Sequence, residues 1–249
     1  MEMADRGDGV RLAFEPLPGR SPTVVFLPGF RSSMAGEKAV ALAAWCARTG
    51  QAMLRLDYSG HGRSQGRFAD GTIGRWTADA AFLLDRVQGP VVLVGSSMGG
   101  WIALLLALAR PGRVAALVGV AAAPDFTEAL MWEAMLPQER EALRRRGTLE
   151  VPGGHGAFPL TWRLIEEGRD HLLLDGAVAL RCPVRLLHGM ADAEVPWETA
   201  TRLAARLASA DVRVTLVKDA THRFSRPQDL ALLVEAVARV VADAQECFT

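Results

Sequence analysis

The chain has 249 residues, of which 50% are hydrophobic and 22% charged, as is ordinary for a folded domain with a large buried core. Lysine plus arginine and aspartate plus glutamate both number 28, so the formal net charge is +0, and no surface for nucleic acid or an anionic membrane is expected. The three cysteines are too few and too widely spaced for a disulfide framework or a metal cluster.

The first half of the chain alternates short strand-like runs with longer helix-like segments. Residues 10–17 alternate weakly and stop at Pro18-Gly19, which predicts an edge strand. Apolar runs predict further strands, and amphipathic spacing predicts the helices between them. The expected strands cover residues 23–27, 52–56, 91–94 and 114–120, and the expected helices cover 38–49, 73–87 and 101–110. This alternation predicts an α/β fold with a mostly parallel, doubly wound sheet.

The alternation breaks between Asp125 and about Leu180. Short helices are expected there over residues 126–135, 138–146 and 160–167, and a Gly-rich turn over 151–156 can lie inside a small hairpin. Strands over 184–187 and 212–217 and helices over 198–207 and 228–244 then resume the pattern. We therefore expect a single domain over residues 1–249, with an inserted lid over about 125–180.

Apolar side chains of this insertion have two open interpretations. They could line an acyl-binding pocket, or they could only dock the insertion on the core, as most buried apolar side chains do. The residues concerned are Phe126, Met131, Trp132, Met135 and Phe158.

Residues 91–100 carry the strongest chemical signal. An apolar strand runs into Gly95-Ser96-Ser97-Met98-Gly99, and a helical pattern follows at once. This order is typical of a nucleophile elbow, in which the central serine lies on a strained turn with its hydroxyl exposed; a glycine-rich turn without catalysis is the alternative. Side chains at positions 95 and 99 would collide with the neighbouring strand or helix. Ser97 is the predicted nucleophile, and the N–H of Met98 is a predicted oxyanion donor.

A serine hydroxyl needs a positioned base at neutral pH. His222 follows the last expected strand and Asp192 follows the strand before it, which is the order of serine, acid and histidine in α/β-hydrolases. We predict that His222 is the general base and then the acid, and that Asp192 orients and stabilises its ring. The N–H of Phe30, after the strand over residues 23–27, is the second predicted oxyanion donor.

Other titratable residues receive less specific assignments. His61 is expected to stabilise its Gly-rich loop by a hydrogen bond, and His188 is expected to be structural. Glu194 is a reserve for Asp192 as the acid. The two remaining histidines, His155 and His171, are expected to be solvated in the lid.

The sequence has no His-x-x-x-His, Cys-x-x-Cys or acidic cluster at the spacing of metal ligands, and no Gly-x-Gly-x-x-Gly after a strand. A serine triad needs no metal and no cofactor, so neither is predicted. The polar N-terminus has neither a signal-peptide nor a transit-peptide pattern, and no apolar run reaches the ~20 residues that span a bilayer. No feature of the sequence specifies an oligomeric state.

Several stretches together resemble one known family. They are residues 27–30, 38–42, 57–60, 95–101 and 182–190, Asp192 with 195–197, and His222-Arg223. On these residues the chain resembles the α/β-hydrolase-fold serine hydrolases, and among them the animal mitochondrial acyl-protein thioesterases that are also acyl-glucuronide esterases. The resemblance runs from about Thr23 to Leu233. It implies a triad of Ser97, Asp192 and His222. The substrates that it implies are palmitoyl-like S-acyl thioesters, which include S-acylated proteins, and activated acyl esters.

We therefore expect a serine hydrolase that cleaves acyl thioesters or esters through an acyl-enzyme. The mitochondrial extension of the resembled family has no counterpart in this sequence, so a free-standing cytoplasmic protein is expected. Two alternatives to this function remain open. One is a general small-molecule carboxylesterase, and the other is a binding module that has the fold without catalysis.

Overall fold

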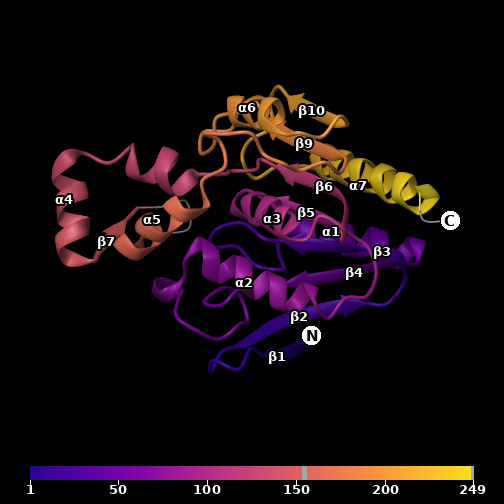
Figure 1. Ribbon diagram of the computed structural model, residues 1–249, viewed down its shortest axis with the longest axis horizontal. Coiled ribbons are helices and arrows are strands. Elements are labelled where there is room, and N and C mark those ends of the chain that lie inside the picture. Colours follow the sequence, from indigo (N-terminus) through magenta and orange to yellow (C-terminus); the bar gives the residue numbers. More distant parts are fainter. Residues whose placement is uncertain (153–155, 248–249) are drawn as a thin grey trace.

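An eight-stranded sheet forms the centre of the computed structural model, which describes residues 1–152 and 156–247 (Figure 1). The strand order is β1-β2-β4-β3-β5-β6-β9-β10. Strands β1 (Glu2–Asp5) and β2 (Arg11–Leu17) pair antiparallel with their neighbours, and all other pairs are parallel. The parallel strands are β3 (Arg20–Leu27), β4 (Gln51–Leu56), β5 (Val91–Ser96), β6 (Val114–Val120), β9 (Val184–Gly189) and β10 (Val212–Val217). The predicted α/β fold with a mostly parallel sheet is confirmed.

Helices cover both faces of this sheet. One face carries α2 (Ile73–Leu84), α3 (Met98–Ala109) and α6 (Glu198–Arg206), and the other carries α1 (Glu37–Thr49) and α7 (Pro227–Cys247). In β5, Leu93 belongs to the apolar cluster of the first face, and Val92 and Val94 belong to that of the second. Successive residues of a strand point to opposite faces, so a strand covered on both sides is apolar throughout.

The expected edge strand over residues 10–17 is not at the edge. Strand β2 lies between β1 and β4, and β1 forms the edge instead. In the register of this pair, Met3 lies opposite Ala13 and Ala4 opposite Leu12. Strand β1 has only four residues, and both of its end residues are acidic. Such a short polar strand shows no period that a sequence pattern could detect, because β2 rather than its own composition holds it.

Between β6 and β9 the chain leaves the sheet, and residues 125–180, here called the inserted segment, form a group of short elements at one side of the molecule (Figure 1). The elements are the π-helix η2 (Thr127–Trp132), α4 (Pro137–Arg146), β7 (Thr148–Val151), β8 (Phe158–Thr161), α5 (Trp162–Gly168) and the 3-10 turn η3 (Arg169–His171). None of the helices that the structure describes is both long and apolar enough to cross a lipid bilayer.

One helix of the inserted segment begins later than its pattern suggests. The helix expected from residue 160 starts at Trp162, because β8 pairs antiparallel with β7 in a hairpin. In β8, Phe158 and Leu160 are buried and their neighbours are half-buried, which is the alternation of a strand. Of the Gly-rich turn expected over residues 151–156, residues 153–155 lie outside the described residues.

Asp125 ties together the two ends of the inserted segment. Its φ of 62° lies in the left-handed region, which aspartate enters more readily than most residues. Its buried carboxylate accepts hydrogen bonds from the N–H groups of Leu173 and Leu174, each at 2.8 Å. Burial raises the pKa of Asp125, although these two hydrogen bonds stabilise the ionised form. The Asp125 side chain therefore connects the start of the inserted segment to Leu173 and Leu174 near its end.

Replacing Asp125 by alanine should destabilise the protein. The two N–H groups of Leu173 and Leu174 would lose their acceptor, and alanine would occupy a left-handed conformation. We expect the free energy of unfolding to fall by about 2–4 kcal/mol in urea denaturation. Asp125→Asn keeps an acceptor oxygen and tolerates the same φ, so it should lose less than half of this amount. Equal stability of the alanine variant and the wild type would contradict this role.

Candidate active site

Strand β5 and helix α3 meet at Ser97, the predicted nucleophile. Its φ of 54° and ψ of −120° are strained for a residue with a side chain, and its N–H donates to the carbonyl oxygen of Val120 at 2.9 Å. A Cβ on Gly95 would collide with the backbone of Gly99, and a Cβ on Gly99 would collide with the carbonyl of Leu27 in β3. The predicted need for both glycines is confirmed.

Ser97, His222 and Asp192 form one hydrogen-bonded row. Nε2 of His222 lies 3.1 Å from Oγ of Ser97, and Nδ1 lies 2.7 Å from Oδ2 of Asp192. The three residues lie on the loops that follow β5, β10 and β9. The carboxyl ends of parallel strands share one edge of the sheet, which is why residues far apart in the sequence meet there.

The carboxylate of Asp192 is fully buried and accepts four hydrogen bonds. Oδ1 accepts from the N–H groups of Glu194 at 2.8 Å and Val195 at 2.9 Å. Oδ2 accepts from His222 and from Nε2 of His188, which lies 3.1 Å away. Burial opposes ionisation, but the hydrogen bonds from His188 and His222 and from the backbone outweigh it and hold the pKa of Asp192 well below its usual range. The ionised carboxylate can stabilise a cationic ring at His222.

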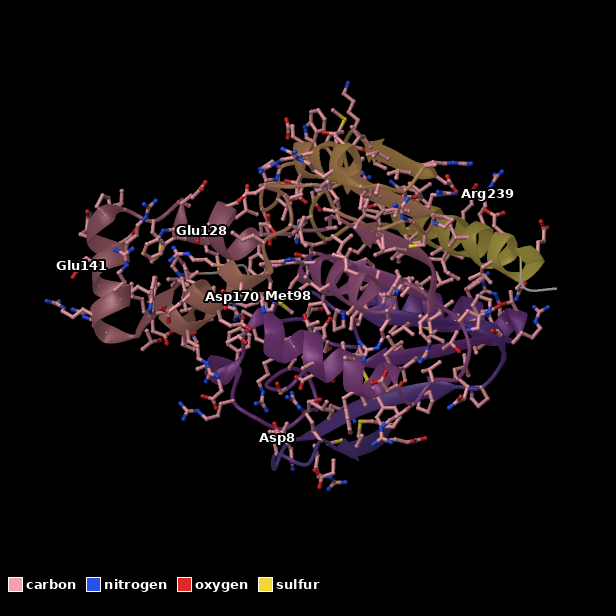
Figure 2. All side chains as sticks on the ribbon, viewed as in Figure 1. Asp8, Met98, Glu128, Glu141, Asp170 and Arg239 are labelled. Carbon is pink, nitrogen blue, oxygen red and sulfur yellow. The ribbon has the colours of Figure 1, made fainter. Side chains whose placement is uncertain are left out.

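The N–H groups of Phe30 and Met98 have no acceptor among the residues that the structure describes. Met98 is the first residue of α3, where backbone N–H groups carry partial positive charge, and it lies where the sheet meets the inserted segment (Figure 2). Phe30 follows Gly29, and a Cβ on Gly29 would lie 3.3 Å from Cβ of Ser97. These two unused donors belong to the residues that follow Gly29 and Ser97, and unused N–H donors near a nucleophile are what the binding of an oxyanion requires.

His61 supports the loop that carries Phe30. Arg31 has a φ of 59°, and its N–H donates to Nε2 of His61 at 3.2 Å. Nδ1 of His61 lies 3.2 Å from the carbonyl oxygen of Ser59, which only accepts, so Nδ1 carries the proton. Burial lowers the pKa of His61 to about 4. The expected loop-stabilising hydrogen bond is present, and through Arg31 it extends to a second loop.

A cavity of about 1310 Å³ opens beside Ser97. Its lining includes polar and charged residues from the start of α1 and from loops that follow the parallel strands, among them Lys38, Glu194 and Arg223. The inserted segment gives it an apolar wall that includes Phe126, Leu130, Met131, Met135, Leu149, Val151, Phe158 and Leu160. The same segment also contributes the polar residues Gln138, Glu139 and Glu150 to the lining. Four of the residues expected at a pocket therefore lie in the wall of this cavity: Phe126, Met131, Met135 and Phe158.

Trp132 does not belong to the described lining of the cavity, in contrast to that expectation. Its ring centroid lies 5.3 Å from that of Trp162, and the guanidinium of Arg144 lies 4.7 Å from the centre of its ring. Consecutive residues of a helix point in different directions, so the turn that places Met131 in the cavity directs Trp132 into the inserted segment. Trp132 holds the segment together.

The sequence pattern missed part of the apolar wall. Leu149, Val151 and Leu160 come from the β7–β8 hairpin, and Leu160 was expected in a helix. The alternation of apolar and polar residues over 148–151 was a strand signal that could have identified them.

The remaining titratable candidates lie outside the hydrogen-bonded row. The carboxylate of Glu194 lies 3.8 Å from Nε2 of His222, the ring nitrogen that faces Ser97, and so does not replace Asp192. His171 is half-buried rather than solvated, because Nε2 lies 3.0 Å from the Glu167 carboxylate. His155 lies outside the described residues. Within the described ranges no group of three or more His, Cys, Asp or Glu could hold a metal ion.

Comparisons with known proteins give the family of the chain. A family model described as serine aminopeptidase, S33, matches residues 20–149. The mouse protein named palmitoyl-protein thioesterase ABHD10, mitochondrial, is 39% identical over 238 residues, which cover 94% of this chain and 80% of the mouse protein. The structure of mouse alpha/beta hydrolase domain-containing protein 10 matches with a TM-score of 0.91 at 37% identity, over 97% of this chain and 98% of that chain. A putative hydrolase from Agrobacterium vitis S4 also has a TM-score of 0.91 at 37% identity, over 96% of each chain.

These relatives correct the expected location. A cytoplasmic protein was expected, and this is wrong, because the matched mouse relative is named as mitochondrial. Targeting segments are read and removed separately from the folded domain, so the composition of the domain does not report where it resides.

The low pKa of His61 implies a specific pH dependence of stability. The pKa is about 4 in the folded chain and about 6.5 in the unfolded chain, so between these values the unfolded chain binds more protons. The neutral form of His61 contributes to the free energy of unfolding, and this contribution is fully present above about pH 6.5. It decreases by roughly 3 kcal/mol as the pH falls to about 4. His61→Gln cannot be protonated and should lack this part of the slope.

Urea denaturation at about pH 7 and about pH 5 measures the difference. The wild type should lose about 2 kcal/mol more than His61→Gln over this interval. Parallel losses in the two proteins would show that His61 is protonated equally in the folded and unfolded chains.

Proposed function

The chain belongs to the α/β-hydrolase family, in the group of the ABHD10 palmitoyl-protein thioesterases, and we propose on this premise that it hydrolyses acyl thioesters and acyl esters through an acyl-enzyme on Ser97. The family resemblance inferred from the sequence motifs is confirmed. The observation that carries the proposal is the hydrogen-bonded row from Ser97 through His222 to Asp192, at a cavity with an apolar wall.

Acylation follows from the positions of these groups. Nε2 of His222 accepts the proton of Ser97 as Oγ attacks the acyl carbonyl carbon. Asp192 stabilises the cationic ring, and the N–H groups of Met98 and Phe30 stabilise the negative charge on the former carbonyl oxygen. The thiolate or alkoxide then leaves, takes the proton from His222, and the acyl group remains on Ser97.

Deacylation uses the same groups in the reverse order. His222 takes a proton from a water molecule, whose oxygen attacks the acyl carbonyl, and returns a proton to Oγ of Ser97 as the acid departs. A thiolate leaves more readily than an amine, so thioesters and esters are preferred to amides.

The cavity supports a long acyl chain as the part of the substrate that is buried. Its volume of about 1310 Å³ exceeds the roughly 300–1,000 Å³ of most ligand pockets. Each methylene that the apolar wall buries contributes about 0.8 kcal/mol. We assign the acyl chain to this wall and the leaving group to the polar and charged residues outside the inserted segment, with the inserted segment as a lid. A leaving group at these residues can be a small thiol or alcohol, or the cysteine of an S-acylated protein.

Ser97→Ala should remove the activity. We expect kcat/KM to fall at least about 10³-fold for an acyl-CoA, an S-acyl peptide, an acyl glucuronide and a nitrophenyl ester, and labelling by a fluorophosphonate probe to disappear. Ser209→Ala, on the loop before β10 at the opposite end of the strand from His222, is the matched control. A wild-type protein that neither reacts with the probe nor hydrolyses any of these substrates would be a non-catalytic binding module.

Met131→Trp tests where the acyl chain lies. A larger side chain in the apolar wall should lower kcat/KM for a palmitoyl thioester roughly tenfold or more and leave a butyryl thioester nearly unaffected. Leu136→Trp is the control, because Leu136 is close in sequence but 54% exposed and outside the cavity lining of the described chain. Equal changes for both chain lengths would favour a general small-molecule carboxylesterase.

A further inference from the structure

We propose that His188 is a positioning residue for Asp192. The buried imidazole of His188 fixes the Asp192 carboxylate and weakens the attraction of that carboxylate for the proton on His222. The inference rests on the proposed catalytic roles of Asp192 and His222. The sequence predicted only a structural role for His188, and this inference gives it a specific role in the site.

His188 lies at the end of β9, and its side chain is fully buried. Nε2 lies 3.1 Å from Oδ2 of Asp192 and 3.1 Å from the carbonyl oxygen of Val195. A carbonyl oxygen only accepts hydrogen bonds, so Nε2 carries a proton and shares it between the two oxygens. The same N–H therefore holds Asp192 and Val195, at two points of the loop that carries the acid.

Oδ2 of Asp192 accepts from two imidazoles at once. His222 is the closer donor at 2.7 Å, and His188 is the second at 3.1 Å. The backbone fixes Oδ1, and His188 fixes Oδ2 independently of His222, so the carboxylate keeps its aim when the His222 ring changes charge. A second donor also stabilises negative charge on Oδ2, which weakens the attraction of this oxygen for the proton on His222.

The other ring nitrogen of His188 argues against a role in packing alone. Nδ1 is buried and has no hydrogen-bond partner among the described residues. A buried polar atom without a partner costs stability, and an apolar side chain of similar size would avoid this cost. The donor that His188 directs at Asp192 is the feature that an apolar residue could not supply.

Other charged groups face the His222 ring, and variants of His188 leave them unchanged. The Glu194 carboxylate lies 3.8 Å from Nε2, and Lys38 and Arg223 line the same cavity. The ammonium of Lys38 donates to the carbonyl oxygen of Arg223, and burial lowers the pKa of Lys38 to about 8. Lys38 therefore titrates on the alkaline side of neutrality. It does not determine the decrease of activity at low pH, here called the acid limb of the activity profile.

The test is the pH dependence of kcat/KM for the acyl thioester. In His188→Leu, Asp192 loses one donor and attracts the proton on His222 more strongly, so the acid limb should move to higher pH by roughly 0.5–1 unit. The maximal kcat should fall roughly tenfold, because the carboxylate is less well fixed. His188→Gln places an amide N–H near the position of Nε2 and should return the limb toward its wild-type position.

Leu187→Ala is the matched control for a merely structural effect. Leu187 precedes His188 on β9, and its buried side chain packs in the apolar cluster on the face of the sheet that α1 and α7 cover. This variant should lower stability and leave the acid limb in place. An unmoved limb in His188→Leu would overturn the proposal even if kcat falls.

Nitrogen NMR of histidine-labelled wild-type protein gives a readout that requires no folded variant of His188. The ring should show a protonated Nε2 and a bare Nδ1, and its Nε2–H signal should shift in His222→Ala, where Oδ2 keeps one imidazole donor. A His188 signal that does not respond to His222→Ala would overturn the proposal. Fluorophosphonate labelling of the same wild-type sample tests the proposed function separately from the role of His188. A missing adduct would contradict the proposed function, whereas the hydrogen bond between His188 and Asp192 could still be measured.

Discussion

At Ser97 the chain turns from β5 into α3 through a backbone conformation that costs about 1–3 kcal/mol, and the packing around the turn keeps it there. Helix α3 lies so close to β3 that the carbonyl of Leu27 occupies the space of a side chain at Gly99. Gly29, the residue before Phe30, also lies against Ser97, since a Cβ on Gly29 would be 3.3 Å from Cβ of Ser97. The nucleophile and both proposed oxyanion donors thus depend on one close approach of backbone to backbone.

The other half of the site depends on a second close approach. A Cβ on Gly189, at the end of β9, would collide with the carbonyl of Ala220, so the loops that carry Asp192 and His222 can meet only with glycine there. Burying a carboxylate between these loops would be unfavourable by itself. Four hydrogen bonds to Asp192 offset that cost and fix the direction in which it faces His222.

Three histidines at this edge differ in role because their neighbours differ. Buried His61 is neutral and accepts from the N–H of Arg31, whereas His188 donates to Asp192 and His222 lies between Asp192 and Ser97. Arg31 also reaches the inserted segment, since its guanidinium donates to the carbonyl of Gly156 at 3.0 Å and lies 4.8 Å from the ring centre of Phe158. The loop that carries Phe30 is thereby linked both to the body of the protein and to the inserted segment.

The sequence by itself determined the parallel strands, the helices between them and the three polar residues that meet at one edge. It could do so because β5 is apolar at every position before the elbow and because parallel strands deliver their following loops to the same edge. Only the tertiary structure decided that β1 is the edge strand, that Trp132 points away from the cavity, and that His188 donates to Asp192. A local pattern reports which side of an element is buried, whereas the partner on that side comes from a distant part of the chain.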